Sequence, residues 1–274
     1  MKIRRDDRPA DHRPRKRFGQ HFLHDPAVIE RIIRAIGPRA GDRMVEIGPG
    51  TGNLTAALLQ HVDHLHVVEL DRDLAAHLQS RFGKALTLHL GDALTFDFSR
   101  LAGGDKGLRV VGNLPYNIST PLLFHLLGFR SQIRDMHFML QLEVVERMTA
   151  TPGGREYGRL SVMVQYHCDC TRLFRVAPGA FTPPPRVESA VVRLVPRPPP
   201  LEATDPGLLG RLVTTAFGQR RKTLRNALRS LAPEELILDA GLDPLLRPER
   251  LSVEEFVRLS NCLAAAGGER GVPV

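Results

Sequence analysis

The sequence predicts a mixed α/β fold: a Rossmann-like, mainly parallel sheet with helices on both faces, followed by a small all-α C-terminal domain. Three observations lead to this prediction. From residue 25 to about 195, short β-branched runs alternate with helix-like segments. The first of these runs ends in a glycine-rich turn, Gly48 to Gly52. A proline cluster near residue 196 then ends the alternation, and only helical patterns follow it.

The elements of the α/β part follow one another in short intervals. An N-cap residue and a first-turn proline, Asp25-Pro26, open the first helix, which carries isoleucines at helical spacing. The expected strands are Met44–Ile47, Leu65–Leu70, Leu86–Leu90, Leu108–Val111, Met136–Leu140, Ser161–Tyr166 and Ala190–Val195. The helical segments between them are Leu54–Leu59, Leu74–Phe82 and Pro121–Leu127.

The run from Pro196 to Pro200 predicts a semi-rigid linker, which places the domain boundary near residue 200. Beyond it, Asp205-Pro206 is expected to start one helix. The next helix should carry an apolar stripe (Leu224, Leu228, Leu231) beside a basic stripe (Arg221, Arg225, Arg229). Ser252–Glu255 has the pattern of a capping box and should open the last helix. The predicted domains are 1–17, 18–199 and 200–274.

The charge is basic and unevenly distributed, with a formal net charge of +8 at pH 7. Residues 1–17 hold eight Lys or Arg against three Asp, and we expect them to form a flexible N-terminal arm. Two basic runs favour a polyanionic partner, because each neutralised phosphate releases counterions. The second run supplies the candidate RNA-binding residues Arg220, Arg221, Lys222, Arg225 and Arg229.

The three cysteines form neither an even disulfide framework nor a pair of CxxC knuckles. We therefore expect reduced thiols, no metal site and a cytoplasmic location. No apolar run approaches the length of about 18 residues that a membrane-spanning helix needs. The basic N-terminus lacks the apolar stretch of a secretory signal.

The glycine-rich turn and two later acids predict a nucleoside site. The dinucleotide fingerprint GxGxxG would need glycine at position 53, where Asn53 stands; the observed form, from Glu46 to Gly52, is the one found in Rossmann-like methyltransferases. Glu69 ends the second strand, where a carboxylate can accept hydrogen bonds from both ribose hydroxyls. Asp92 ends the third, where a carboxylate can accept one from an adenine amino group. The predicted cofactor is S-adenosylmethionine.

The fourth strand ends in Asn113-Leu114-Pro115-Tyr116. An aromatic amine is a poor nucleophile because its lone pair is delocalised into the ring. A side-chain amide oxygen and a backbone carbonyl can accept its two N–H protons and expose the lone pair to a methyl donor. Tyr116 offers a face on which a base can stack. The tetrapeptide therefore predicts methylation of an exocyclic base amine, with Asn113, Leu114 and Tyr116 as candidate catalytic residues.

With these motifs the chain resembles the KsgA (RsmA) family of small-subunit ribosomal RNA adenine dimethyltransferases, across nearly all of residues 16–265. The matching segments are Lys16–Leu23, Glu46–Gly52, Asn113–Tyr116, Gln141–Arg147, Tyr157–Ser161, Phe181–Ser189 and Arg221–Leu228. The last, in the helical domain, is the most discriminating.

The resemblance implies that residues 18–199 form an S-adenosylmethionine-dependent methyltransferase domain and residues 200–274 a helical RNA-binding domain. It implies dimethylation of two adjacent adenosines in the 3′-terminal hairpin loop of 16S RNA, by a monomer acting on the small-subunit precursor. The implied cofactor contacts are His21, Leu23, Gly48, Glu69, Asp92 and Asn113. Phe181 resembles the aromatic residue that packs against the target base opposite Tyr116. Position 21 departs from asparagine, the commonest residue of the family there.

Three other functions compete with this one. The related large-subunit enzyme of macrolide resistance shares the glycine loop and the Asn-aromatic motif, but is not expected to carry the Arg221–Leu228 segment. A nucleic-acid-binding factor that kept the fold and lost catalysis would show damage at Asn113 or the glycines. A DNA adenine methylase would normally begin the tetrapeptide with aspartate.

Overall fold

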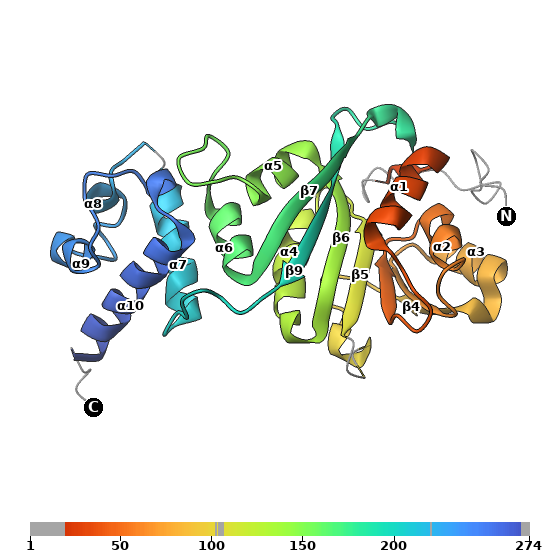
Figure 1. Ribbon diagram of the computed structural model, residues 1–274, viewed down its shortest axis with the longest axis horizontal. Coiled ribbons are helices and arrows are strands. Elements are labelled where there is room, and N and C mark those ends of the chain that lie inside the picture. The colour runs from red at the N-terminus through yellow and green to blue at the C-terminus, as the bar shows by residue number, and fades with distance from the viewer. Residues whose placement is uncertain (1–19, 102, 104–106, 220, 270–274) are drawn as a thin grey trace. The chain divides into compact units, whose positions relative to one another are not determined.

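The computed structural model describes residues 20–101, 103, 107–219 and 221–269. The basic arm expected over residues 1–17 lies outside the described residues, and so does Arg220. Within the described part, a seven-stranded sheet and its helices are followed by a helical C-terminal part (Figure 1). The predicted mixed α/β fold with a helical C-terminal part is therefore confirmed.

The large sheet has the strand order β4-β3-β2-β5-β6-β9-β7. Strands β2 to β6 run parallel, whereas β9 pairs with β6 in the antiparallel direction. A separate two-stranded sheet pairs β1 with β8, which places Leu23 opposite Phe181. The strands are β1 Phe22–Leu23, β2 Met44–Ile47, β3 Leu65–Glu69, β4 Leu86–Leu90, β5 Leu108–Asn113, β6 Ile133–Gln141, β7 Cys168–Val176, β8 Phe181–Thr182 and β9 Ser189–Pro196.

Both faces of the sheet are covered. Val110 and Val111 are neighbours on β5, so their side chains point to opposite faces, and both are fully buried. Helices α1 and α2 share one core cluster with β2, β3, β5, β6 and β9. The helices of this part of the chain are α1 Pro26–Ile36, α2 Asn53–Leu58, α3 Arg72–Phe82, α4 Ser119–Leu127 and α5 Leu142–Met148. In the described part of the chain, no helix combines the length and the apolar character needed to cross a membrane.

One expected strand is wrong, and one strand of the sheet was not predicted. Residues 161–166, expected as a strand, lie in helix α6 (Arg159–His167). Its residues are buried on several sides, and a short apolar run of this kind does not distinguish a buried helix from a strand by periodicity. The missing strand is β7, which directly follows this helix. Many side chains of β7 are exposed, so apolar and polar residues do not alternate along it in the pattern that predicts a strand.

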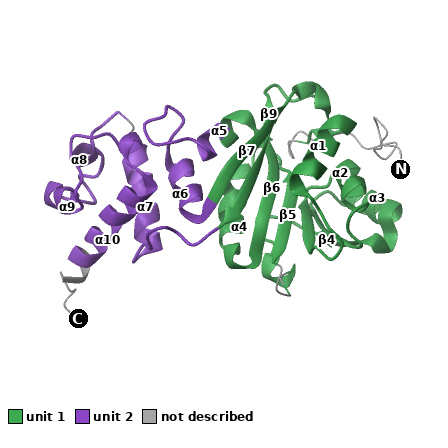
Figure 2. Ribbon diagram, viewed as in Figure 1, with its two compact units in different colours: residues 1–145, 169–196 green, residues 146–168, 197–274 purple. Residues whose placement is uncertain are grey.

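The chain divides into two compact units, residues 1–145 with 169–196, and residues 146–168 with 197–274 (Figure 2). The second unit thus takes in residues 146–168, which the sequence placed in the first domain. The reason is burial: Tyr157, Val162 and Tyr166 lie in one apolar core with Leu209 and Leu212. Its helices are α6, α7 Pro206–Gly218, α8 Leu224–Ala227, α9 Glu234–Asp239 and α10 Val253–Glu269.

Two helices of the second unit begin where the sequence predicts. The Asp205 side chain accepts from the backbone N–H of Leu208 at the start of α7. The Ser252 capping box is confirmed, because Ser252 N donates to Glu255 and Glu255 N donates to the Ser252 hydroxyl. The prediction of one helix that carries both the apolar and the basic stripe is wrong, because α8 spans only Leu224–Ala227.

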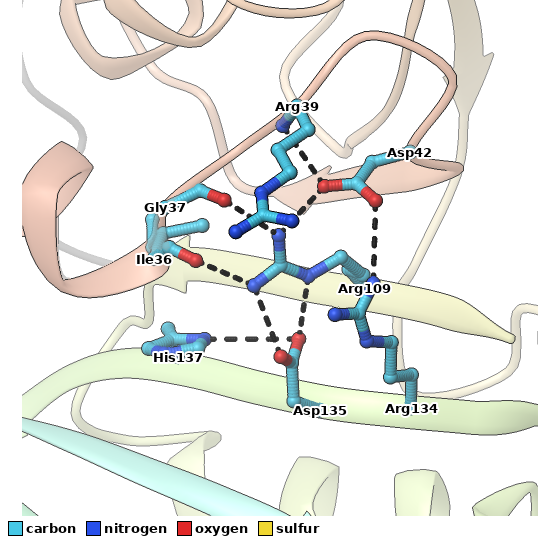
Figure 3. A network of polar contacts seen from close by, with 8 residues as sticks. All are labelled: Ile36, Gly37, Arg39, Asp42, Arg109, Arg134, Asp135 and His137. Carbon is cyan, nitrogen blue, oxygen red and sulfur yellow. Dashed lines mark hydrogen bonds and ion pairs between the residues drawn. The ribbon is translucent and has the colours of Figure 1, made fainter. Parts of the chain in front are cut away.

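A buried ionic network joins the end of helix α1 to the sheet (Figure 3). Arg109, on β5, is 4% exposed. Its guanidinium donates to Asp135 on β6 at 2.9 and 3.0 Å, and to Asp42 at 2.8 Å. It also donates to the carbonyl oxygens of Ile36 (2.6 Å) and Gly37 (3.4 Å), at the C-terminus of α1. Arg109 therefore satisfies helix-end carbonyls that have no partner within the helix.

Burial alone would raise the pKa of Asp42, but hydrogen bonds from Arg109 and from the Arg39 backbone lower it below its ordinary value. His137 lies beside Asp135 in the same network, 3.9 Å away. Burial lowers the pKa of His137 to about 4 in spite of this carboxylate, so the imidazole is neutral near pH 7. The buried charges of the network are thus Arg109, Asp42 and Asp135, and Arg134, whose side chain is half exposed, adds an ion pair of 3.3 Å to Asp42.

Candidate functional site

A cavity of about 290 Å³ opens where the parallel strands β2, β3 and β5 end. The carboxyl ends of parallel strands meet at one edge of a sheet, and ligands of open α/β sheets bind there. The cavity gathers all the residues expected at the cofactor and three of the four expected catalytic residues, Asn113 belonging to both groups. They are His21, Leu23, Gly48, Glu69, Asp92, Asn113, Leu114 and Tyr116.

The turn after β2 has a backbone that requires glycine at two positions. Gly50 has a φ of 60°, and a Cβ atom there would lie 2.9 Å from the ring of Phe22 on β1. Gly52 has a φ of 81°, and a Cβ atom would lie 2.7 Å from the ring of Phe82 on α3. The turn therefore passes tightly between these two rings, in a conformation that other residues rarely adopt.

Glu69, at the end of β3, holds this turn in place. Its Oε2 accepts from Gly50 N at 3.3 Å, and its Oε1 accepts from Asp71 N at 2.8 Å. Burial raises the pKa of Glu69, and the backbone N–H groups of Asp71 and Gly50 oppose that rise. Asp92 is exposed at the end of β4, where its side chain accepts from Leu94 N. Two carboxylates thus line the cavity at the positions predicted for ribose and adenine.

A third carboxylate, Glu46, was part of the glycine motif but received no role from the sequence. It is 2% exposed, and the hydroxyl of Thr55 donates to its Oε2 at 2.6 Å. Burial, together with the nearby Glu69, raises the pKa of Glu46 to about 8, against the hydrogen bond from Thr55. At this pKa the carboxyl of Glu46 is protonated in large part at neutral pH.

Asn53 is a second residue whose contribution the sequence missed. Its Nδ2 donates to the carbonyl oxygen of Leu23 at 2.9 Å, and the residue is buried. This hydrogen bond ties β1 to the start of α2, directly beside the glycine turn. The signal was available, because Asn53 stands where the dinucleotide fingerprint requires glycine.

Asn113 ends β5 and faces the segment that precedes β1. Its Nδ2 donates to the carbonyl oxygen of His21 at 2.8 Å. With the amide nitrogen so engaged, the amide oxygen is the group left to accept a hydrogen bond from a ligand. The next residue, Leu114, is fixed because its backbone N–H donates to Met139 on β6 at 3.1 Å.

Tyr116 is half-buried and lies at the mouth of the same cavity. Its hydroxyl shares a hydrogen bond of 2.8 Å with the hydroxyl of Ser189, on β9. Burial raises the pKa of Tyr116, against the opposing effect of this hydrogen bond. The ring of His21 stacks on that of Tyr116, with 5.6 Å between ring centroids and 27° between the planes.

Phe181, to which the family resemblance assigns a place beside the target base, is buried in this structure. It is 2% exposed, belongs to the apolar core and is absent from the described lining of the cavity. Its strand β8 pairs with β1, which places Phe181 opposite Leu23, and both side chains belong to the same apolar core. Stacking of Phe181 on a base stays a prediction, and this conformation offers no exposed face for it.

The candidate RNA-binding residues lie in the second unit, and four of the five are described. Arg221, Lys222, Arg225 and Arg229 are all exposed. Arg225 forms an ion pair of 3.9 Å with Glu234, in which both side chains are about half exposed. Such an exposed pair contributes little to stability, so the arginine remains able to contact another anion.

The composition of the cavity limits its ligand. Acidic residues line it, and its described lining contains no Lys or Arg. This fits a nucleoside that carries positive charge and disfavours a pyrophosphate, which needs cationic or N–H partners. Over residues 20–101, 103, 107–219 and 221–269, no group of three or more His, Cys, Asp or Glu side chains could hold a metal ion. Besides these acids, the cavity is lined by the side-chain amide of Asn113 and by Tyr116, whose hydroxyl is bonded to Ser189.

Known proteins resemble this chain over most of its length. The sequence profile of the ribosomal RNA adenine dimethylase family matches residues 11–265. The chain is 60% identical over 262 residues to the ribosomal RNA small subunit methyltransferase A of Pseudomonas aeruginosa, covering 94% of this chain and 98% of that protein.

Two solved structures are similar in fold and in sequence. A dimethyladenosine transferase from Plasmodium falciparum aligns with a TM-score of 0.77 at 26% identity, covering 90% of this chain and 98% of that one. The 23S ribosomal RNA methyltransferase ErmE aligns with a TM-score of 0.68 at 26% identity, covering 89% and 99%.

Proposed function

Because the chain belongs to the ribosomal RNA adenine dimethylase family, we propose that it transfers methyl groups from S-adenosylmethionine to N6 of two adjacent adenosines in the 3′-terminal hairpin loop of 16S ribosomal RNA. One structural observation carries this proposal. The glycine turn, the carboxylates of Glu69 and Asp92 and the amide of Asn113 line one cavity, so a nucleoside cofactor and a base amine can meet there.

The residues at the sheet edge hold the cofactor. Gly48 lies at its methionine end, Glu69 binds the ribose hydroxyls and Asp92 accepts from the adenine amino group. Leu23 supplies apolar contact, and the acidic lining complements the positive charge of the sulfonium. S-adenosylmethionine supplies a methyl group that is already activated by that charge, so the reaction needs neither a metal ion nor a strong base.

Asn113 and Leu114 position the adenine amine. The Asn113 side chain cannot rotate freely, because its Nδ2 is held by the His21 carbonyl oxygen. Its Oδ1 accepts one amine proton, and a backbone carbonyl of the tetrapeptide accepts the other. These two acceptors direct the lone pair of the nitrogen toward the methyl group. Tyr116, fixed through its hydroxyl on Ser189, offers the base a face on which to stack.

The RNA is bound by a separate surface. Arg220, Arg221, Lys222, Arg225 and Arg229 contact phosphates and do no chemistry. The substrate is a precursor of the small ribosomal subunit, on which the protein acts as a monomer in the cytoplasm. A hairpin loop favours this reaction, because its bases leave the stack at little cost.

The competing functions are less well supported. The large-subunit enzyme ErmE is 26% identical, whereas the small-subunit relative from Pseudomonas aeruginosa is 60% identical. A factor without catalysis would be free to lose Asn113 or the glycines. Asn113, Gly48 and Gly50 are all present and line the cavity, and Gly52 is present beside them.

Methyl transfer to three substrates tests the proposal: immature small ribosomal subunits, large ribosomal subunits and duplex DNA. We expect dimethyladenosine in the small-subunit RNA alone. Methylation of the large subunit or of DNA in its place would assign the protein to one of the competing classes, and no methylation of any substrate would favour the binding factor.

A further inference from the structure

Arg81, in the last turn of helix α3, reaches the glycine turn that follows β2. Its Nη1 donates to the carbonyl oxygen of Thr51 at 2.7 Å. Thr51 is 4% exposed and lines the cavity, whereas Arg81 is partly exposed and lies outside the described lining. The arginine therefore supports the turn from a side other than the one that faces the cavity.

The same turn of α3 packs against Gly52. A Cβ atom at this position would lie 2.7 Å from the ring of Phe82 and 2.8 Å from the side chain of Leu78. The guanidinium carbon of Arg81 lies over the Phe82 ring, 4.9 Å from its centroid. One helical turn thus holds two neighbouring residues of the glycine turn, Gly52 by apolar contact and Thr51 by a hydrogen bond.

The glycine turn depends on contacts of this kind because of its composition. Gly48, Gly50 and Gly52 have φ values of 63°, 60° and 81°. Glycine populates many other conformations at little cost, so the local sequence does not hold this shape by itself. Two hydrogen bonds restrain N–H groups of the turn: Gly52 N donates to the Pro49 carbonyl oxygen at 2.9 Å, and Gly50 N donates to Glu69.

The Thr51 carbonyl is restrained by Arg81. Over residues 20–101, 103, 107–219 and 221–269, the guanidinium is its one hydrogen-bond donor. A buried carbonyl that loses its donor is left unsatisfied, so conformations of the turn that expose this oxygen to water become competitive. A ligand would then have to order the turn as it binds, and this requirement lowers its affinity.

We propose that Arg81 is a positioning residue of the cofactor site, which holds the Thr51 carbonyl, and with it the glycine turn, in the conformation that binds S-adenosylmethionine. This inference rests on the proposed function. Arg81 touches neither the cofactor nor the base and acts only through the turn. It restrains a carbonyl group of the turn, whereas Glu69 restrains an N–H group.

Two ligands distinguish this role from an effect of the arginine's charge. S-adenosylmethionine carries a positive sulfonium, and S-adenosylhomocysteine is the same molecule without the methyl group and without that charge. If Arg81 acts through the turn, its loss weakens the binding of both ligands by the same factor. If it acted through its charge, its loss would strengthen the binding of the cation alone.

Two variants and a matched control divide the chemistry of the side chain. Arg81→Met removes every N–H donor and keeps an unbranched chain over Phe82, and Arg81→Lys keeps a donor and the charge. Arg34→Met is the control, because Arg34 is likewise the basic residue in the last turn of an 11-residue helix, α1. Its side chain is exposed and forms an ion pair of 3.7 Å with Glu30. The control therefore removes a cation from a helix C-terminus without touching the glycine turn.

The measurements are the Kd of each variant for both ligands in calorimetry, the amide hydrogen exchange of the protein, and kcat and KM for the cofactor with small-subunit precursor. We expect Arg81→Met to raise both Kd values equally, about 2- to 12-fold, the range that corresponds to one ordinary hydrogen bond. KM should rise with kcat unchanged, and exchange should accelerate in residues 48–52 alone. Arg81→Lys and Arg34→Met should resemble the wild type.

Three results would overturn the inference and leave the proposed function intact. They are wild-type Kd values in Arg81→Met, tighter binding of S-adenosylmethionine with unchanged affinity for S-adenosylhomocysteine, and exchange that accelerates throughout the chain, which would indicate a general loss of stability. A wild-type protein that binds the cofactor but methylates no ribosomal RNA would overturn the proposed function alone. One that does not bind the cofactor would overturn both.

Discussion

Replacing Asn113 tests the proposed chemistry most directly. Asn113→Ala removes the amide oxygen proposed to accept an amine proton, and also the Nδ2 hydrogen bond to the His21 carbonyl oxygen. The glycine turn and Glu69 keep their own contacts, because Gly50 and Asp71 still donate to Glu69. The exposed arginines of the second unit are not touched.

The two losses have different magnitudes. A lost hydrogen bond within the protein costs about 0.5–1.5 kcal/mol of stability. Loss of a preorganised hydrogen-bonding group at a reacting centre costs about 2.7–4 kcal/mol of transition-state stabilisation, or a factor of about 10²–10³ in rate. We therefore expect the methylation rate to fall by two to three orders of magnitude, and the affinities for cofactor and RNA to fall much less.

Asn113→Asp tests whether a side-chain oxygen at this position is sufficient, or whether it must also be held in place by the Nδ2 hydrogen bond. Aspartate keeps an acceptor but sets a second oxygen against the His21 carbonyl, where Nδ2 now donates over 2.8 Å. The side chain loses its anchor, so this variant should not restore the rate. The assay is a single-turnover measurement on immature small subunits, with mono- and dimethyladenosine quantified separately. An Asn113→Ala rate within tenfold of wild type would refute the amine-positioning mechanism.

Three further predictions concern binding and stability. Glu69→Ala should weaken cofactor binding by about 1.5–3 kcal/mol in calorimetry, as for hydrogen bonds to a charged group; unchanged affinity would remove Glu69 from the site. Replacing Arg221, Arg225 and Arg229 with Gln should reduce the slope of log affinity for RNA against log salt concentration by about 0.7–0.9 for each phosphate that is no longer neutralised, without changing the affinity for the cofactor. A slope equal to that of the wild type would mean that these arginines are only solvated. Because burial raises the pKa of Glu46 to about 8 from 4.5, the native state binds more protons than the unfolded state between these values. Stability should therefore decline from about pH 4.5 to 8 relative to Glu46→Gln in denaturant titrations, and parallel pH curves would contradict this.

Much of the fold could be predicted because its signals are local. The central strands β2 and β5 are mostly apolar and buried on both faces, and glycine or acidic residues stand at the ends of the parallel strands. Since parallel strands end at one edge, the sequence alone is enough to expect Glu69, Asp92 and Asn113 to meet there. The glycine turn at residues 48–52 is equally local, because its positive φ values exclude most other residues.

The errors arise where burial depends on distant parts of the chain. Val162, Val164 and Tyr166 resemble a strand in sequence, yet they belong to a helix whose core partners follow residue 200. The stripe of Leu224 and Leu228 is buried as expected, but the helix is one turn long. The burial of Phe181 likewise depends on a distant segment, because β8 pairs with β1 and places Phe181 opposite Leu23 in the core; its stacking on a base stays a prediction.

The Arg109 network has a consequence for how this protein can vary. Removing one member of a buried ion pair costs about 3–5 kcal/mol because it leaves a charge uncompensated, whereas joint replacement by apolar residues of similar volume is often neutral or stabilising. Arg109, Asp42 and Asp135 lie far apart in the sequence and share the same hydrogen bonds. Their substitutions are therefore epistatic. Homologous chains should keep all three residues or exchange them together, and a single change at one position should persist only where the others have already changed.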